Sequence, residues 1–222
     1  MNSKFFYVGV DLGEVNDYSA VTILEKTFEM DTRPHSYKQV GVYSVTHLER
    51  FRITYPDVVS RVKTLFRNPK LKDAVLIVDE TGCGRPVADM MEKENLRPVR
   101  ISITGGLEVR ELEDGFHVPK QHLVSALMVL FQSGTLKIAD ALELAPTLVA
   151  ELENFRVKVN AKTGRESFES WRENDHDDMV LSLALACWYA EQDNRTNVSL
   201  KPSPTQRAGY DPLTFRSKRG RR

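Results

Sequence analysis

The sequence has few cysteines and no long apolar run, and each of these absences excludes a class of protein. Its two cysteines, Cys83 and Cys187, are far apart and form no CxxC pair. This argues against a disulfide scaffold and a zinc ribbon, and it suits a reducing cytoplasm. The longest apolar run, about residues 179–190, is too short to span a bilayer, and no signal peptide is recognisable. We therefore predict a soluble intracellular protein with no membrane partner.

An excess of charge is also missing, since 31 Lys and Arg residues balance 31 Asp and Glu residues. Bulk charge therefore gives no sign of a nucleic-acid partner. Basic residues do concentrate in the segment 216–222, which carries five of them in seven positions. Such a run is either a solvated tail or an arm that contacts DNA. Because periodicity is lost after Asp193, we expect a domain over 1–192 and a basic, flexible tail over 193–222.

The order of the predicted strands and helices indicates the fold class. Runs of apolar, often β-branched residues predict five main strands: 4–12, 19–24, 39–45, 73–79 and 97–103. Helical spacing of apolar residues predicts helices that begin near Tyr55, after Thr81, at Pro119, at about 141 and near Asp177. Alternation on both sides of the loop 160–164 predicts a β-hairpin. This order is that of a ribonuclease H-like α/β fold. Its mixed central sheet has three antiparallel strands, then parallel strands, and is flanked by helices.

Acidic residues stand at the ends of three apolar elements and form the candidate active site. Asp11 ends the first strand, Asp79 ends the fourth, and Asp177 and Asp178 begin the last helix. Carboxylate oxygens are preferred ligands of hard divalent cations. Two such ions about 3.5–4 Å apart can activate water and stabilise the leaving oxygen of a phosphoryl displacement. The sequence therefore suggests a metal-dependent hydrolase that needs no nucleophilic side chain.

Each of these acids also has a structural explanation. Asp11 could stabilise the turn that follows it, and Asp79 could cap the turn at Thr81. Asp177 and Asp178 could favour the dipole of the helix that they begin. That helix is apolar nearly all round, so its first turn should lie against the sheet, where buried carboxylates are costly without a cation. We therefore favour the metal site.

Five short motifs are spaced along the chain. They are Tyr7–Gly13, Asp17–Ala20, Val78–Gly84, His117–Lys120 and His176–Ala186. Together they resemble the nuclease domain of tailed-bacteriophage terminase large subunits, a DNA-packaging family of the ribonuclease H-like superfamily. The last motif, a histidine and two aspartates followed by alternating Leu and Ala, is the most specific, whereas the first is shared across the superfamily. The resemblance covers about residues 5–192.

The resemblance implies an endonuclease that depends on two Mg²⁺ or Mn²⁺ ions. Such an enzyme cuts concatemeric double-stranded viral DNA when packaging starts and when it ends. The residues that match the family's catalytic, metal-binding acids are Asp11, Asp79, Asp177 and Asp178. Three further residues could support the site: Asp17, His176 and Lys120. Of these, the histidine would orient the site or cap the helix, and the lysine would either contact a phosphate or remain solvated.

The same resemblance suggests a DNA path and partners. The predicted hairpin over 155–171 resembles a hairpin near the DNA path of the family, although a solvated hairpin has the same pattern. Its candidate DNA-binding residues are Lys158, Lys162 and Arg165. The implied partners are double-stranded DNA, a packaging ATPase domain, a portal and a small terminase subunit, and the implied location is the host bacterial cytoplasm.

The chain departs from full-length terminase large subunits in one respect, because it has no GxxxxGK[ST] loop to hold a triphosphate. We therefore expect either the nuclease domain alone or a shortened relative, without ATP hydrolysis or DNA translocation. The balanced charge predicts weak, salt-sensitive DNA binding. Cleavage should show little sequence preference, since no recognisable element reads base edges.

Three alternative functions remain open. Residues 9–13 also resemble the first phosphate motif of actin-like ATPases and sugar kinases, but those proteins need two copies of the fold. A Holliday-junction resolvase is a second nuclease of this architecture, although the histidine–aspartate–aspartate motif favours terminase. A binding module that has kept the fold and lost activity is the third, and the four acids argue against it.

Overall fold

The computed structural model describes residues 3–13, 17–31, 38–82, 84–154, 158–160, 165–167 and 177–197. By their contacts the residues divide into two units, Met1–Gln192 and Asp193–Arg222, which are described separately. In its described residues the second unit contains one short helix, α6 (Asn194–Asn197), in which Arg195 pairs with the preceding residue, Asp193, at 2.6 Å. The predicted tail lies outside the described residues beyond this helix. Each helix in the described ranges is too short or too polar to cross a membrane.

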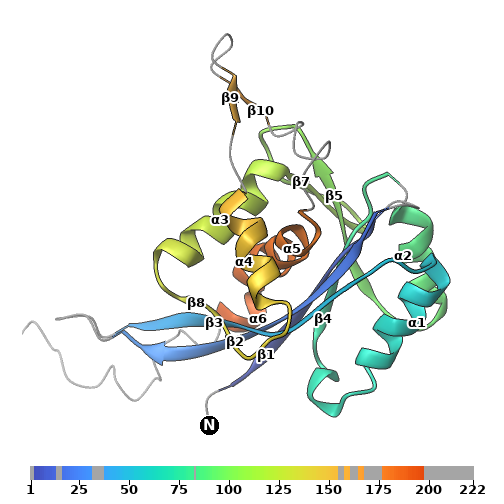
Figure 1. Cartoon of the computed structure of the whole chain (residues 1–222), viewed down its shortest axis with the longest axis horizontal. Helices are drawn as coiled ribbons and strands as arrows, with labels where there is room; N and C mark the ends of the chain where they lie inside the picture. The colour runs from blue at the N-terminus through green and yellow to red at the C-terminus, as the bar shows by residue number, and fades with distance from the viewer. Residues whose placement is uncertain are drawn as a thin grey trace, which may run out of the picture. The chain divides into compact units, whose positions relative to one another are not determined.

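The first unit is built on one mixed sheet of eight strands in the order β6-β7-β5-β4-β1-β2-β3-β8 (Figure 1). The strands are β1 (Phe5–Asp11), β2 (Ser19–Met30), β3 (Gln39–Phe51), β4 (Val75–Asp79), β5 (Pro98–Thr104), β6 (Arg110–Glu111), β7 (Gly115–Pro119) and β8 (Leu136–Ile138). Strands β1, β2 and β3 are antiparallel, and β4, β5 and β7 continue from β1 in parallel. The predicted mixed sheet is therefore confirmed.

Several predicted boundaries were wrong. Strand β2 continues past 24 because it pairs with the start of β3, as far as Met30 opposite Gln39. Strand β3 continues past 45 because its end pairs with the start of β2, as far as Phe51 opposite Ser19. The helix expected from 141 is α4 (Ala145–Asn154), and it is preceded by turns in which Leu142 and Ala145 donate to carbonyls three residues back. The predicted hairpin is present as β9 (Lys158–Asn160) and β10 (Arg165–Ser167), which pair antiparallel but are shorter than expected.

Helices cover both faces of the sheet. On one face lie α1 (Tyr55–Leu65) and α2 (Gly84–Lys93), with the short helix η1 (Pro69–Leu71), and on the other lie α3 (Lys120–Gln132), α4 and α5 (Asp178–Gln192) (Figure 1). Since successive strand residues point to opposite faces, β1 contributes to two cores. Tyr7 belongs to the core beneath α3, α4 and α5, whereas Val8 and Val10 belong to the core beneath α1 and α2.

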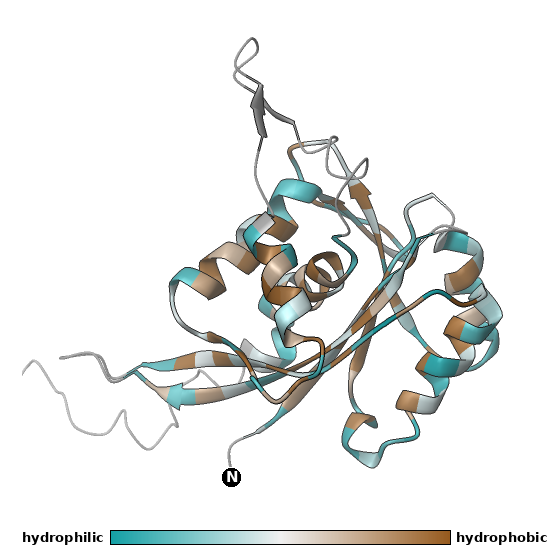
Figure 2. Cartoon of the chain, viewed as in Figure 1, coloured by the Kyte–Doolittle hydropathy of each residue, from teal (hydrophilic) through white to brown (hydrophobic). Residues whose placement is uncertain are grey.

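Helix α5 is the buried centre of its layer, as its composition predicts. Nearly every residue from Asp178 to Ala190 is buried, and Figure 2 shows hydrophobic residues on all sides of this helix. Gly9 of β1 allows the helix to approach, because a Cβ atom at this position would lie 2.0 Å from the carbonyl oxygen of Ser182. The Ser182 side chain is also hydrogen-bonded to Thr22 of β2, at 2.7 Å. These contacts hold α5 directly against the two central strands.

Candidate active site

The first pair of predicted acids lies at one edge of the sheet. Val10 of β1 pairs with Val78 of β4 in parallel register, so the next residues, Asp11 and Asp79, stand side by side at the carboxyl ends of adjacent strands. Both residues are buried, with 7% and 4% of their surface exposed. In open α/β sheets this edge is where ligands bind. The structure therefore brings together two of the four predicted catalytic acids.

Asp79 also stabilises the turn that follows it. Its Oδ1 atom accepts hydrogen bonds from the backbone N–H of Thr81, at 2.8 Å, and from the hydroxyl of Thr81. The Thr81 hydroxyl oxygen in turn accepts the N–H of Ile103 on β5. Asp79 therefore caps the turn at Thr81, which was the structural explanation considered for it. This cap accounts for one carboxylate oxygen and fixes the orientation of the group.

Helix α5 brings the other two acids to the same edge. Asp178, in the first turn of α5, accepts hydrogen bonds through Oδ2 from Nε and Nη2 of Arg50, at 3.2 and 3.0 Å. Arg50 on β3 pairs with Ala20 on β2, and Ala20 pairs with Asp11. The register across three strands therefore places Asp178 at the level of Asp11. Asp177 precedes Asp178, and its Oδ2 atom lies 3.5 Å from Nζ of Lys120 at the start of α3.

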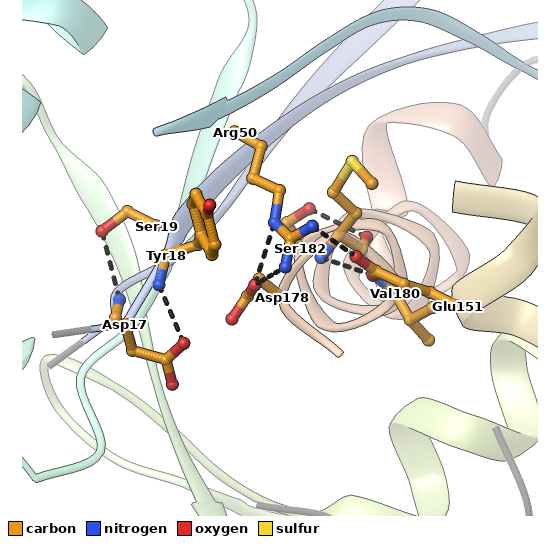
Figure 3. A network of polar contacts seen from close by, with 10 residues as sticks. Asp17, Tyr18, Ser19, Arg50, Glu151, Asp178, Val180 and Ser182 are labelled. Atoms are coloured by element: carbon orange, nitrogen blue, oxygen red, sulfur yellow. Dashed lines mark hydrogen bonds and ion pairs between the residues drawn. The ribbon is translucent and has the colours of Figure 1, made fainter. Parts of the chain in front are cut away.

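Glu151 of α4 holds the first turn of α5. Its Oε2 atom accepts the backbone N–H groups of Met179 and Val180, at 3.1 and 3.3 Å, which the helix itself cannot satisfy. Its Oε1 atom lies 3.6 Å from Nη1 of Arg50 (Figure 3). Burial raises the pKa of Glu151 to about 7, against the opposing effects of Arg50 and the two backbone donors. Glu151 therefore links the start of α5 to the guanidinium group that holds Asp178.

Sequence reasoning missed both Arg50 and Glu151. Glu151 follows Leu148 by three residues and therefore lies on the buried side of its helix, which is a signal that the sequence does contain. Arg50 has no such signal, because it lies near the end of a strand, next to Glu49, and its partner is 128 positions away. The contact between Arg50 and Asp178 can be found only from the folded structure.

Charges around Asp178 oppose its ionisation. Burial raises its pKa, and the charges of Asp17 and Asp177 raise it further, whereas the hydrogen bond and charge of Arg50 lower it. Asp17 is itself exposed, and its Oδ1 atom accepts the backbone N–H of Tyr18. Of the three predicted supporting residues, Asp17 is thus one whose charge acts on Asp178.

A divalent cation suits these residues by their chemistry. All four acids offer carboxylate oxygens, the ligands that Mg²⁺ and Mn²⁺ prefer, and the repulsion acting on Asp178 is what a cation would relieve. Within the part of the chain that the structure describes, however, no group of three or more His, Cys, Asp or Glu residues is arranged so that it could hold a metal ion. The side chains of four further candidates, His176, Lys158, Lys162 and Arg165, lie outside this part.

The mixed sheet, with acids where two parallel strands end and a buried helix begins, defines a ribonuclease H-like α/β protein. No protein-family model and no curated protein matches the chain. Among solved structures, the chain matches the large terminase nuclease from the thermophilic phage G20c, with a TM-score of 0.56 and 25% sequence identity. The match covers 83% of this chain and 81% of that one. The resemblance inferred from the motifs is therefore confirmed: the chain has a terminase nuclease-like fold.

Proposed function

We propose that the chain is a divalent-metal-dependent endonuclease that cuts concatemeric double-stranded viral DNA at the start and end of genome packaging. The main observation that supports this proposal is that Asp11 and Asp79 lie at the ends of adjacent parallel strands, with Asp178 at the same level at the start of α5. The likeness to a terminase nuclease supports this function over a resolvase or an actin-like ATPase.

The ions would be one or two Mg²⁺ or Mn²⁺, held by Asp11, Asp79, Asp177 and Asp178. When bound, such ions activate water and neutralise the charge that develops on the phosphate. The chain's own contribution is to fix its acids in place. Thr81 orients the carboxylate of Asp79, Arg50 orients that of Asp178, and two buried cores prevent the supporting strands from moving. Such preorganisation is the main contribution that a protein makes to phosphoryl transfer.

The proposed partners follow from the same resemblance. They are double-stranded DNA, a packaging ATPase, a portal and a small terminase subunit, in the cytoplasm of a bacterial host. The hairpin of β9 and β10 supports a DNA path on this protein, since Lys158 and Arg165 belong to its strands. The 1–192 segment would act as the nuclease domain, and the basic run over 216–222 would add non-specific affinity for DNA.

Plasmid cleavage tests the proposal. The chain should nick or linearise plasmid DNA with Mg²⁺ or Mn²⁺, without ATP, and EDTA should stop the reaction. Asp79→Asn should abolish cleavage while keeping the size of the side chain, and the matched change at an exposed acid, Asp140→Asn, should have no effect. Normal cutting by Asp79→Asn would contradict the site. If the wild-type chain cuts with neither metal, and calorimetry detects no Mn²⁺ binding, the chain is a binding module without nuclease activity.

A further inference from the structure

The guanidinium group of Arg50 occupies a position between two acidic side chains. It donates to Oδ2 of Asp178 through two nitrogens, and its third nitrogen, Nη1, faces Oε1 of Glu151 at 3.6 Å (Figure 3). The three side chains are nearly buried, with exposed fractions of 14% for Arg50, 6% for Asp178 and 7% for Glu151. Salt screens such buried ion pairs far less than it screens ion pairs at the surface. Arg50 is therefore a fixed internal charge of the site.

An aromatic ring fixes Arg50 from the side. The guanidinium carbon of Arg50 lies 4.0 Å from the ring centre of Tyr18, a cation–π contact. A side chain held by two acids and a ring has little freedom to turn away. The arrangement is therefore part of the fold, in contrast to a solvated arginine that happens to meet a carboxylate.

Arg50 offsets a local excess of negative charge. Asp178 is buried and directly follows another acid, Asp177, and Arg50 donates two hydrogen bonds to its carboxylate. Asp177 has a cation of its own, since Lys120 lies 3.5 Å from it. Asp177 and Asp178, the two consecutive acids at the start of α5, are therefore each neutralised by a basic side chain from another element, and both are proposed metal ligands.

We propose that Arg50 is an internal counter-ion that holds Asp178 in place in the metal-free chain, and that a divalent cation must compete with it for this carboxylate. The inference rests on the proposed function and deepens it, because it assigns a metal-regulating residue to the same site. Arg50 is a positioning residue here and takes no part in the chemistry. It keeps the acids assembled before a metal arrives, and it weakens metal binding by repulsion.

Calorimetric titration with Mn²⁺ tests the competition. Arg50→Gln should bind Mn²⁺ about tenfold more tightly than the wild-type chain, since removing one nearby positive charge relieves repulsion of a divalent ion. The matched control is Arg61→Gln. Arg61 of α1 also makes two hydrogen bonds to one carboxylate, that of Glu49, which neighbours Arg50 on β3 but points to the opposite face. The control should bind Mn²⁺ like the wild type.

Stability without metal tests the counter-ion role by itself. In EDTA, Arg50→Gln should unfold at a lower urea concentration than the wild type, and the loss should shrink when Asp178→Asn is also present. This double-mutant cycle isolates the pair. If Arg50→Gln does not fold, the variant Glu151→Gln is used in its place. Its amide oxygen can still accept from the α5 backbone, but it no longer carries a charge that attracts Arg50, so Arg50 interacts with Asp178 alone. Glu151→Gln should bind Mn²⁺ several-fold more weakly.

The outcomes separate the inference from the proposed function. Unchanged or weaker Mn²⁺ binding by Arg50→Gln, in a wild-type chain that binds Mn²⁺ and cuts DNA, would overturn the counter-ion role alone. Unchanged or tighter binding by Glu151→Gln would do the same. If neither the wild type nor any variant binds Mn²⁺, both the inference and the metal-dependent function are wrong. Tighter binding by Arg50→Gln, with no change in Arg61→Gln, would support the inference.

Discussion

At the residue scale, Asp79 combines a structural contact with a proposed catalytic one. Its Oδ1 atom caps the turn at Thr81, and the same carboxylate stands beside Asp11 at the edge of the sheet. A substitution can separate these two contributions, because an amide keeps the cap but loses the charge. The effect on stability and the effect on cleavage should therefore diverge between two variants of this residue.

Asp79→Asn should lower the free energy of unfolding by less than about 1 kcal/mol, because its amide oxygen can still accept from Thr81. Asp79→Ala leaves those donors without their acceptor and should cost about 2 kcal/mol. Both variants should fail to cut DNA. Urea unfolding in EDTA measures the stability of both variants, and plasmid cleavage measures their activity. Equal stability of the two variants would show that the cap contributes nothing.

Arg52 is a second residue with a testable role. It stacks on Tyr18 from 4.1 Å and is exposed, and no acidic side chain in the described ranges forms an ion pair with it. An exposed cation that rests on an aromatic ring suits a DNA phosphate. Arg52→Ala should weaken binding to all duplex sequences alike, and reduce the slope of log affinity against log salt by about 1. Anisotropy titrations in EDTA measure this. Arg67→Ala, at an exposed arginine just beyond α1, is the control and should leave the slope unchanged.

At the element scale, the site depends on how closely α5 packs on β1. Gly9 permits this contact, since any side chain there would meet the backbone of Ser182. The helix cannot move outward without losing its buried contacts with both central strands. The distance between the acids at the start of α5 and those of the strands is therefore set by packing in the core as well as by the acids themselves.

Gly9→Ala should consequently lower the free energy of unfolding by about 3 kcal/mol, because the new methyl group displaces the helix. The loss should be measured by urea unfolding without metal. Gly105→Ala provides the control, since a Cβ atom there meets nothing within 4 Å, and its effect should stay below about 0.5 kcal/mol. Similar stability of the two variants would mean that β1 and α5 can separate at little cost.

Elements with a long apolar run were predicted from the sequence, whereas elements with few apolar residues were missed. Strands β1 and β4 are continuous apolar runs, and the sequence predicted them with their terminal acids. Strands β6 and β7 were missed because one has only two residues and the other only two apolar side chains, Phe116 and Val118, too few to show a period. The acids of the site were identifiable at strand and helix ends. Arg50 was not, because the contact that gives it a role joins distant parts of the chain.

At the scale of the whole molecule, the proposed metal should act as a stabilising ligand. An ion that binds only the folded chain raises the free energy of unfolding by about 2.7 kcal/mol at a concentration of 100 times its Kd. We therefore expect Mn²⁺ to raise the melting temperature and EDTA to reverse the rise. Asp178→Asn should remove most of the effect, and Asp140→Asn should not. Equal melting temperatures with and without Mn²⁺ would contradict a metal bound to the native state.

The hydrogen bond between Thr22 and Ser182 spans 160 positions of the chain, and this separation has a consequence for folding. A chain that emerges from the ribosome presents β1, β2 and β3 long before α5 exists. The core on the α5 face, and with it the full set of acids, can close only when α5 has been made. Contacts between such distant segments slow folding. The site should therefore mature late, so that nascent chains carry the sheet but lack cleavage activity until synthesis has passed α5.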